Sequence, residues 1–275
     1  MDERPSRPWH VFATYATAVA FIVATTLVVV DMLHTMYPDV PDETLVATLP
    51  GLMAGVLGTS TALLLTLAVV VRPLTPARLR LLPGWETGPT LAAAVLGMLA
   101  LSQALDSLAV VVGLGDSPAL MLIRRTLEGT TGPDLFGAVV VVGLIAGTAE
   151  EVFFRGYMQS WLREHWSPWA SVVTASIGFA LLHVDTTLVH TVMAFALGLY
   201  LGWVVETTGS TLPAITCHVV NNIVYTLQTA LGTAPQGRDA NLIAAPLAVA
   251  VFVGCVLWVR RAARYAPPLP PMDVE

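Results

Sequence analysis

The sequence contains no lysine: all of its basic residues are arginine, and only 12% of its 275 residues are charged. A soluble domain of this length would need a far more charged surface to stay in water. Hydrophobic residues make up 55% of the chain and the mean hydropathy is +0.72, so a lipid bilayer is the simplest environment for it. The net charge of −6 argues against nucleic acid as a partner.

Cysteine is nearly as scarce. The two cysteines, Cys217 and Cys255, each lie inside an apolar run and have no CxxC spacing. Such isolated thiols indicate neither a disulfide framework nor a zinc finger. We expect both to be small, buried side chains.

Apolar runs of about 20 residues, enough for a helix to cross a bilayer, recur along the chain. They predict an all-α, polytopic membrane protein of about eight transmembrane helices. The first run is too long to be a cleaved signal peptide. The expected spans are Val11–Leu33, Leu45–Val71, Thr90–Leu114, Leu135–Leu162, Pro168–His183, Thr187–Glu206, Leu212–Leu231 and Leu242–Val259.

The loop arginines predict the orientation of these spans. Most of them fall on the side of the two termini, and only Arg124, Arg125 and Arg238 fall on the opposite side. Because positive charge concentrates on the cytoplasmic side, both termini are expected in the cytoplasm, in agreement with an even number of spans. The amphipathic segment Pro118–Leu127 is expected to lie along the far interface.

Two long loops containing proline and glycine separate the first three predicted spans from the rest. We predict three regions: N-terminal helices and loops that serve as scaffold (1–134), a catalytic helical core (135–231), and a last span with a disordered, proline-rich tail (232–275). Polar residues within spans concentrate in the second region, which therefore holds the candidate site.

The fourth predicted span carries two adjacent carboxylates and an arginine: Glu150, Glu151 and Arg155. A charge in a membrane helix costs about 2.5–3.5 kcal/mol, so something must compensate it. Glu151 and Arg155 are four residues apart and can form an ion pair. Glu150 lies about 100° away around the helix, without a partner in its own span. An unpaired carboxylate in an apolar environment takes up a proton more readily than one in water, which suits a general base.

Imidazoles occur in two other predicted spans: His183 ends the fifth, and His218 lies four residues before Asn222 on one face of the seventh. With Glu150, the histidines could bind zinc or another divalent metal, as in zinc proteases. They could instead orient a water that Glu150 deprotonates, with Asn222 donating to a histidine or to the developing oxyanion. Asp185 is a candidate to orient the ring of His183.

The motifs Glu150-Glu151-x-x-x-Arg155, Phe179-x-x-x-His183 and His218-x-x-x-Asn222, in this order, resemble those of the CPBP family of CAAX proteases and bacteriocin-processing enzymes, also called the Abi family. This family includes type II CAAX prenyl endopeptidases and lysostaphin-resistance-like proteins. The resemblance covers about residues 135–227 and implies an all-helical membrane fold and peptide-bond hydrolysis. It implies that a catalytic water is surrounded by Glu150, His183, His218 and Asn222, with Glu151 and Arg155 in support. Both a metal site (Glu150, His183 and His218) and a metal-free, glutamate-based mechanism stay open.

We therefore expect a multi-pass protein of a bacterial cell membrane that cleaves a membrane-associated protein or peptide, of CAAX or bacteriocin type. The partners expected are that substrate and the lipid bilayer, and the oligomeric state is not readable. Two other functions compete. A catalytically silent self-immunity or scaffold protein would be expected to lack a motif residue, and none is missing. A proton-coupled transporter would be expected to show an internal repeat, and none is detectable.

One geometric difficulty follows from straight spans. They would place His183 near the far end of its helix and His218 about two turns from the cytoplasmic end, a mismatch in depth of about 10 Å. A tilted span, or a span that starts deeper in the membrane, would remove it.

Overall fold

The computed structural model describes residues 7–266, which contain helices and no strand. The tail that the sequence predicts to be disordered is Ala266–Glu275, and all of it except Ala266 lies outside the described residues. The elements in chain order are α1 (Pro8–Met36), α2 (Asp42–Leu45), α3 (Leu49–Val70), α4 (Gly88–Val111), α5 (Pro118–Leu127), α6 (Gly132–Ala138), η1 (Val139–Ala146), α7 (Gly147–Glu151), η2 (Val152–Gln159), α8 (Ser160–Arg163), α9 (Pro168–Leu181), α10 (Val189–Thr208), α11 (Leu212–Leu231) and α12 (Gly237–Ala263).

Helices occur at all eight predicted positions, and the chain is a multi-pass integral membrane protein. Six of the helices are long and apolar enough to cross a bilayer: α1, α3, α4, the continuous helix Gly132–Arg163, α10 and α12. The other two differ from that pattern. α9 is apolar but has only 14 residues. α11 has 20 residues, and its histidine, asparagine and glutamine side chains make it less apolar than the six.

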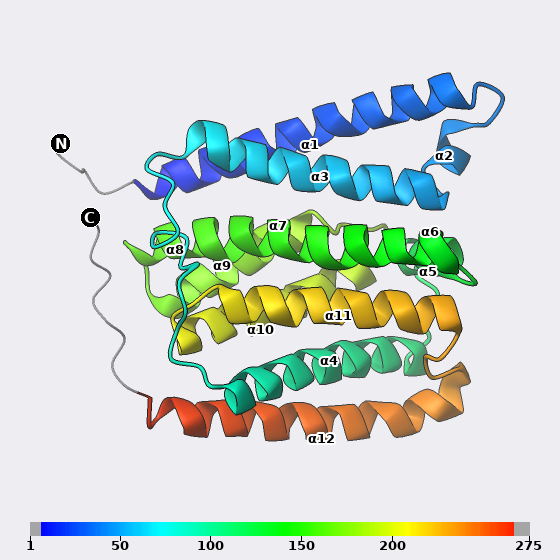
Figure 1. The fold of residues 1–275 in the computed structure, drawn as a ribbon. Helices are drawn as coiled ribbons and strands as arrows, with labels where there is room; N and C mark the ends of the chain where they lie inside the picture. The colour runs from blue at the N-terminus through cyan, green and yellow to red at the C-terminus, as the bar shows by residue number, and fades with distance from the viewer. Residues whose placement is uncertain (1–6, 267–275) are drawn as a thin grey trace.

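The helices are stacked in layers (Figure 1). The hairpin of α1 and α3 forms one side, the pair of α4 and α12 forms the other, and the helix that contains α7 lies between them together with α11. α1 begins and α12 ends at the same end of the bundle, as an even number of crossings requires. The predicted scaffold region 1–134 is thus divided in space, because α1–α3 and α4 lie on opposite sides of the core.

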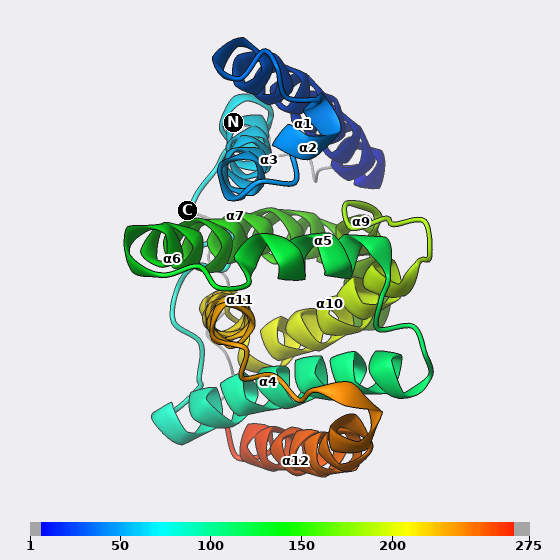
Figure 2. The ribbon, with the colours of Figure 1, turned by 90° about the vertical axis from the view of Figure 1, so that its right-hand side faces the viewer.

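The amphipathic helix α5 lies across the opposite end of the bundle, with its length turned across the direction of the long helices (Figure 2). This is the placement expected from the sequence for Pro118–Leu127. Its last turn carries Arg124 and Arg125.

Glycines allow η2 to pack closely on α10. Arg155 Nη2 donates to the carbonyl oxygen of Gly198 at 3.0 Å, and Gln159 Nε2 donates to that of Gly202 at 3.1 Å, one turn further along both helices. A Cβ at Gly198 would lie 3.1 Å from the Arg155 guanidinium, and one at Gly202 would lie 2.9 Å from Gln159. Small residues are therefore required where these helices cross.

The connection from α3 to α4 forms hydrogen bonds and an ion pair with the end of α10 and the start of α11. Trp85 Nε1 donates to the carbonyl of Thr207 at 2.6 Å, and Arg80 Nη1 forms an ion pair with Glu206 at 3.1 Å. The amide of Thr211 donates to the carbonyl of Arg80 at 2.8 Å. The start of α11 therefore lies beneath this connection.

Candidate active site

Glu151 lies at the centre of the polar cluster and has no solvent exposure. Its Oε1 accepts a hydrogen bond from Arg155 Nη1 at 2.7 Å and lies 2.8 Å from Nδ1 of His218. Because a carboxylate paired with arginine can only accept, Nδ1 of His218 donates a hydrogen to it. The neutral ring then presents the lone pair of Nε2. Glu151 thus fixes both the tautomer and the orientation of His218.

Arg155 is fully buried, and three groups compensate its charge. It pairs with Glu151, it donates to the carbonyl oxygen of Gly198, and its guanidinium carbon lies 4.8 Å from the centre of the Phe179 ring. A buried charge is tolerated when it is paired and hydrogen-bonded in this way. The predicted ion pair between Glu151 and Arg155 is confirmed. It holds the Glu151 carboxylate in the position where it accepts from Nδ1 of His218.

Glu150 occupies a different side of the same helical turn and faces a pocket of about 330 Å³. Its Oε2 lies 3.6 Å from Nε2 of His218, too far for a direct hydrogen bond and close enough for one water to bridge. The walls come from α1, the residues just before and within α3, and the turn after α9: Thr26, Val29, Val30, Val46, Gly51, Leu52, Gly55, Val56, Thr59, Leu182 and His183. Helices outside the family resemblance therefore close the site.

His183 reaches this pocket from the turn that follows α9. Its Nδ1 lies 2.9 Å from the carbonyl oxygen of Phe179, which can only accept, so Nε2 carries the lone pair of the neutral ring. The Phe179 ring contacts both imidazoles, with centres 4.6 Å from His183 and 5.8 Å from His218. The expectation for Asp185 is wrong: its carboxylate accepts from Thr187 at 2.6 Å, and the Phe179 carbonyl orients His183 instead.

Asn222 shares a face of α11 with His218, but its amide is engaged elsewhere. Its Nδ2 donates to the carbonyl oxygen of Val142 at 3.2 Å. Within residues 7–266, no hydrogen bond joins Asn222 to His183 or His218. Val142 belongs to η1, and the π-helices η1 and η2 flank the turn that carries the two glutamates. Such wide turns occur frequently at functional sites.

The expected mismatch in depth between His183 and His218 is absent because α11 starts deep in the bundle. Thr211, just before α11, donates to the carbonyl of Leu79 at 3.0 Å, and Leu79 packs on Gly156. Gly156 lies two turns, or about 10 Å, before the end of the helix Gly132–Arg163. His218 is therefore level with the glutamates and not with the bundle end.

Gly147 lets α11 approach the turn that carries the glutamates, since a Cβ there would lie 3.1 Å from the backbone of Val219. Gly147→Leu is expected to destabilise the protein by about 1–3 kcal/mol and to separate Glu151 from His218, because added volume in a packed interior forces the backbone apart. Thermal unfolding in detergent and peptide cleavage measure the two effects. Gly254→Leu, where nothing lies within 4 Å, is the matched control; equal losses in both variants would contradict this role.

The metal alternative requires Glu150, His183 and His218 to act as ligands together. In the described part of the chain, no three histidine, cysteine, aspartate or glutamate side chains form a group that could hold a metal ion. These residues therefore do not fit a metal in this arrangement, and the chemistry below uses only the protein's own groups.

The fold and the site define a class: multi-pass membrane proteins in which a cluster of glutamates and histidines from separate helices borders a pocket within the bundle and can carry out acid–base chemistry. Residues 132–224 match the family described as "Type II CAAX prenyl endopeptidase Rce1-like", a family of peptidases. This match confirms the resemblance found in the sequence for the segment that carries the three motifs. Searches of curated proteins and of solved structures found no match.

Proposed function

We propose that the chain is an intramembrane endopeptidase in which Glu150 activates the attacking water. The observation that supports this most directly is the position of Glu150, which faces a pocket and lies 3.6 Å from the lone-pair nitrogen of His218. A water between them can donate one hydrogen to each. The match of residues 132–224 to a family of peptidases supports peptide-bond hydrolysis as the reaction.

The reaction proceeds as follows. Glu150 takes a proton from the water while the oxygen attacks the carbonyl carbon of the peptide bond. The tetrahedral intermediate then collapses: the carbon–nitrogen bond breaks, and Glu150 returns the proton to the departing amine. His218 holds the water in place because its Nε2 accepts the second hydrogen of the water, while its Nδ1 donates to Glu151. Nε2 of His183 can likewise only accept, so it receives a hydrogen from an N–H of the bound peptide.

Asn222 is the proposed donor to the oxyanion. To reach a substrate oxygen, its Nδ2 would exchange the carbonyl of Val142 for the substrate. Hydrogen bonds that serve catalysis are often formed only in the complex with substrate. The pocket walls would take aliphatic side chains of the peptide, since they consist mainly of valine, leucine, glycine and threonine.

The substrate class that we propose is a membrane-associated protein or peptide, of CAAX or bacteriocin type. The test compares the peptide termini present in membranes that contain the wild-type protein with those in membranes that contain Glu150→Gln. New termini should appear only with the wild-type protein. A candidate substrate found in this way is then cleaved in proteoliposomes that contain the purified chain. Identical termini in the two membranes would overturn the proposal.

Removal of divalent metals is expected to leave hydrolysis unchanged. The reason is that Glu150, His183 and His218 do not gather into a three-ligand site within the described residues. The measurement is cleavage by purified protein before and after treatment with 1,10-phenanthroline and removal of the chelator. A loss of activity that returns with zinc would show that a metal takes part.

A further inference from the structure

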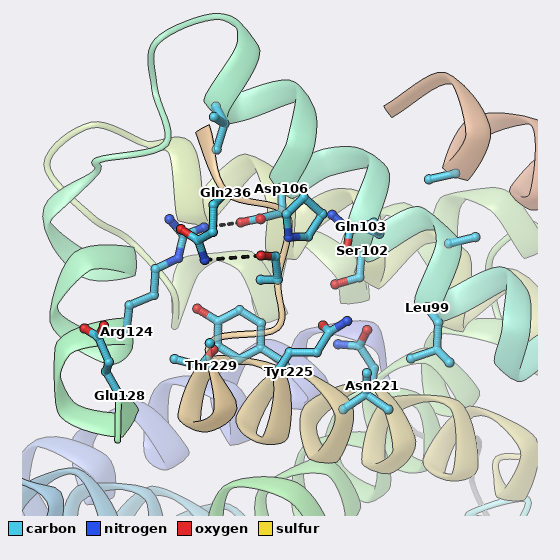
Figure 3. Close-up of a pocket in the computed structure, with 18 of the residues that line it drawn as sticks. Leu99, Ser102, Gln103, Asp106, Arg124, Glu128, Asn221, Tyr225, Thr229 and Gln236 are labelled. Atoms are coloured by element: carbon cyan, nitrogen blue, oxygen red, sulfur yellow. Dashed lines mark hydrogen bonds and ion pairs between the residues drawn. The ribbon is translucent and has the colours of Figure 1, made fainter. Parts of the chain in front are cut away.

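A second pocket, of about 570 Å³, lies on another side of α11 and shares no lining residue with the pocket at Glu150 (Figure 3). His218 contacts Glu151, whereas Asn221, Tyr225 and Gln228 follow each other at helical spacing along a neighbouring face and line this pocket. Its other walls are α4, α5, the turn after α11, and α12. The two pockets are therefore separate sites on one helix.

The lining of this second pocket changes in character with depth. Asp106, Arg124, Arg125 and Glu128 lie at the end of the bundle crossed by α5. Amide side chains, including Gln103 and Asn221, come next, followed by aliphatic residues. Leu96, at the apolar end, lies ten residues before Asp106 on α4, or about 15 Å along the helix. Leu96 and Val251 are 50% and 42% exposed, so the apolar end opens to the lipid.

The charges at the mouth balance. Arg124 is paired with Asp106, while Arg125 and Glu128 are exposed and form no ion pair within residues 7–266. The mouth of this pocket therefore carries one unpaired cation, Arg125, and one unpaired anion, Glu128. Arg238 donates to the carbonyl of Val111 nearby, so the three arginines predicted for this side of the membrane all gather around the pocket.

Polar groups inside the pocket keep hydrogens free for a ligand. Gln103 donates one amide hydrogen to Ser107 at 2.9 Å, and Asn221 donates one to Asn222 at 3.5 Å, so each amide has a second hydrogen available. The hydroxyl of Tyr225 is buried beside Arg124 and meets no hydrogen-bond partner of good geometry in the described chain. Figure 3 shows Tyr225 and Asn221 on α11 and Gln103 across the pocket on α4, and Asn221 is only 7% exposed. A buried hydroxyl is rarely left without a partner, so a ligand with acceptor oxygens fits beside Tyr225 and the free amide hydrogens.

We propose that this pocket binds one zwitterionic phospholipid, such as phosphatidylethanolamine. Arg125 and the Tyr225 hydroxyl take the phosphate, and Glu128 takes the ammonium group. Gln103 and Asn221 donate to the ester carbonyls, and an acyl chain lies along Leu96 and Val251. The order of charged, amide and aliphatic residues matches the order of groups along such a lipid. This site is independent of the proposed peptidase activity.

The test is native mass spectrometry of the full-length chain in detergent with added lipid. Phosphatidylethanolamine should remain bound as one molecule, phosphatidylglycerol should bind more weakly because it lacks the ammonium group, and diacylglycerol should not remain bound. Equal retention of all three lipids would overturn the proposal. Inorganic phosphate should not displace the lipid; if it does, the site is one for free phosphate.

Three variants assign the contacts. Arg125→Gln should weaken binding of phosphatidylethanolamine about tenfold, the effect of losing one charge-assisted hydrogen bond. Glu128→Gln should remove the preference over phosphatidylglycerol while leaving that lipid bound. Val251→Trp fills the apolar end and leaves the charged residues in place, so it should weaken the binding of both lipids.

Arg261→Gln is the matched control, because Arg261 is an exposed arginine at the other end of the bundle. If Arg125→Gln and Val251→Trp retain lipid as well as Arg261→Gln does, the pocket does not bind phospholipid.

Discussion

Glu150→Gln is expected to lower the rate of peptide hydrolysis about 100- to 10,000-fold, the usual contribution of a general base. The amide has nearly the shape of the carboxylate but cannot take a proton from the water bridging it to His218. Stability should change little, because the Glu150 side chain forms no direct hydrogen bond within residues 7–266 and borders the pocket. The measurement is cleavage of a membrane-anchored peptide by purified protein, together with thermal unfolding.

Asp134→Asn is the matched control, since this exposed carboxylate lies near the start of the same long helix. It should cleave as fast as the wild-type protein. Full activity of Glu150→Gln would remove the base from the mechanism. If the chain were a silent scaffold protein or a proton-coupled transporter, it would not cleave peptides. No variant would then differ from the wild-type protein in hydrolysis.

Arg155→Met is expected to destabilise the protein by about 3–5 kcal/mol, because it leaves the carboxylate of Glu151 buried without its ion pair. The loss should be visible as a lower midpoint of thermal unfolding in detergent. It should exceed the loss in Gly147→Leu, where packing and not charge is disturbed. Unfolding at the wild-type temperature would show that the ion pair does not hold this part of the structure together.

The double variant Glu151→Leu/Arg155→Met separates stability from catalysis. Removing both charges leaves no unpaired ion, so part of the lost stability should return. Activity should not return, because Nδ1 of His218 then lacks the acceptor that fixes its tautomer. Recovery of both properties together would show that Glu151 and Arg155 act only on folding.

Helical periodicity predicted the parts of the site that lie within one helix. Glu151 and Arg155 are four residues apart, and their ion pair follows from the geometry of any helix. The helix positions also follow from apolar runs, although α11 is less apolar than a typical span because it carries His218 and Asn222 into the bundle. These features depend on local sequence alone.

Contacts between helices could not be derived in the same way. Nothing in the sequence says that Glu151, and not Asn222, binds Nδ1 of His218, because this depends on how α11 packs beside Gly147. The partner of His183 was missed for a related reason. It is the backbone carbonyl of Phe179, which every residue type possesses, so nearby Asp185 was a misleading candidate.

The role of the first helices also depended on the three-dimensional structure. α1 and α3 carry no motif residue, and their sequences indicate only apolar spans. In the bundle, Val29 and Gly55 belong to the wall that faces Glu150. Gly55 has open space where a side chain would stand, so a substrate side chain can approach it. We therefore expect these helices to influence which peptides are cleaved.

Water labelled with ¹⁸O tests the central claim most directly. The purified chain is incubated in labelled water with a membrane-anchored peptide that it cleaves, and the products are analysed by mass spectrometry. If Glu150 directs a water to the peptide carbonyl, the new carboxyl terminus carries one ¹⁸O with the wild-type protein, and no labelled product forms with Glu150→Gln. Equal labelling by both proteins would contradict the account.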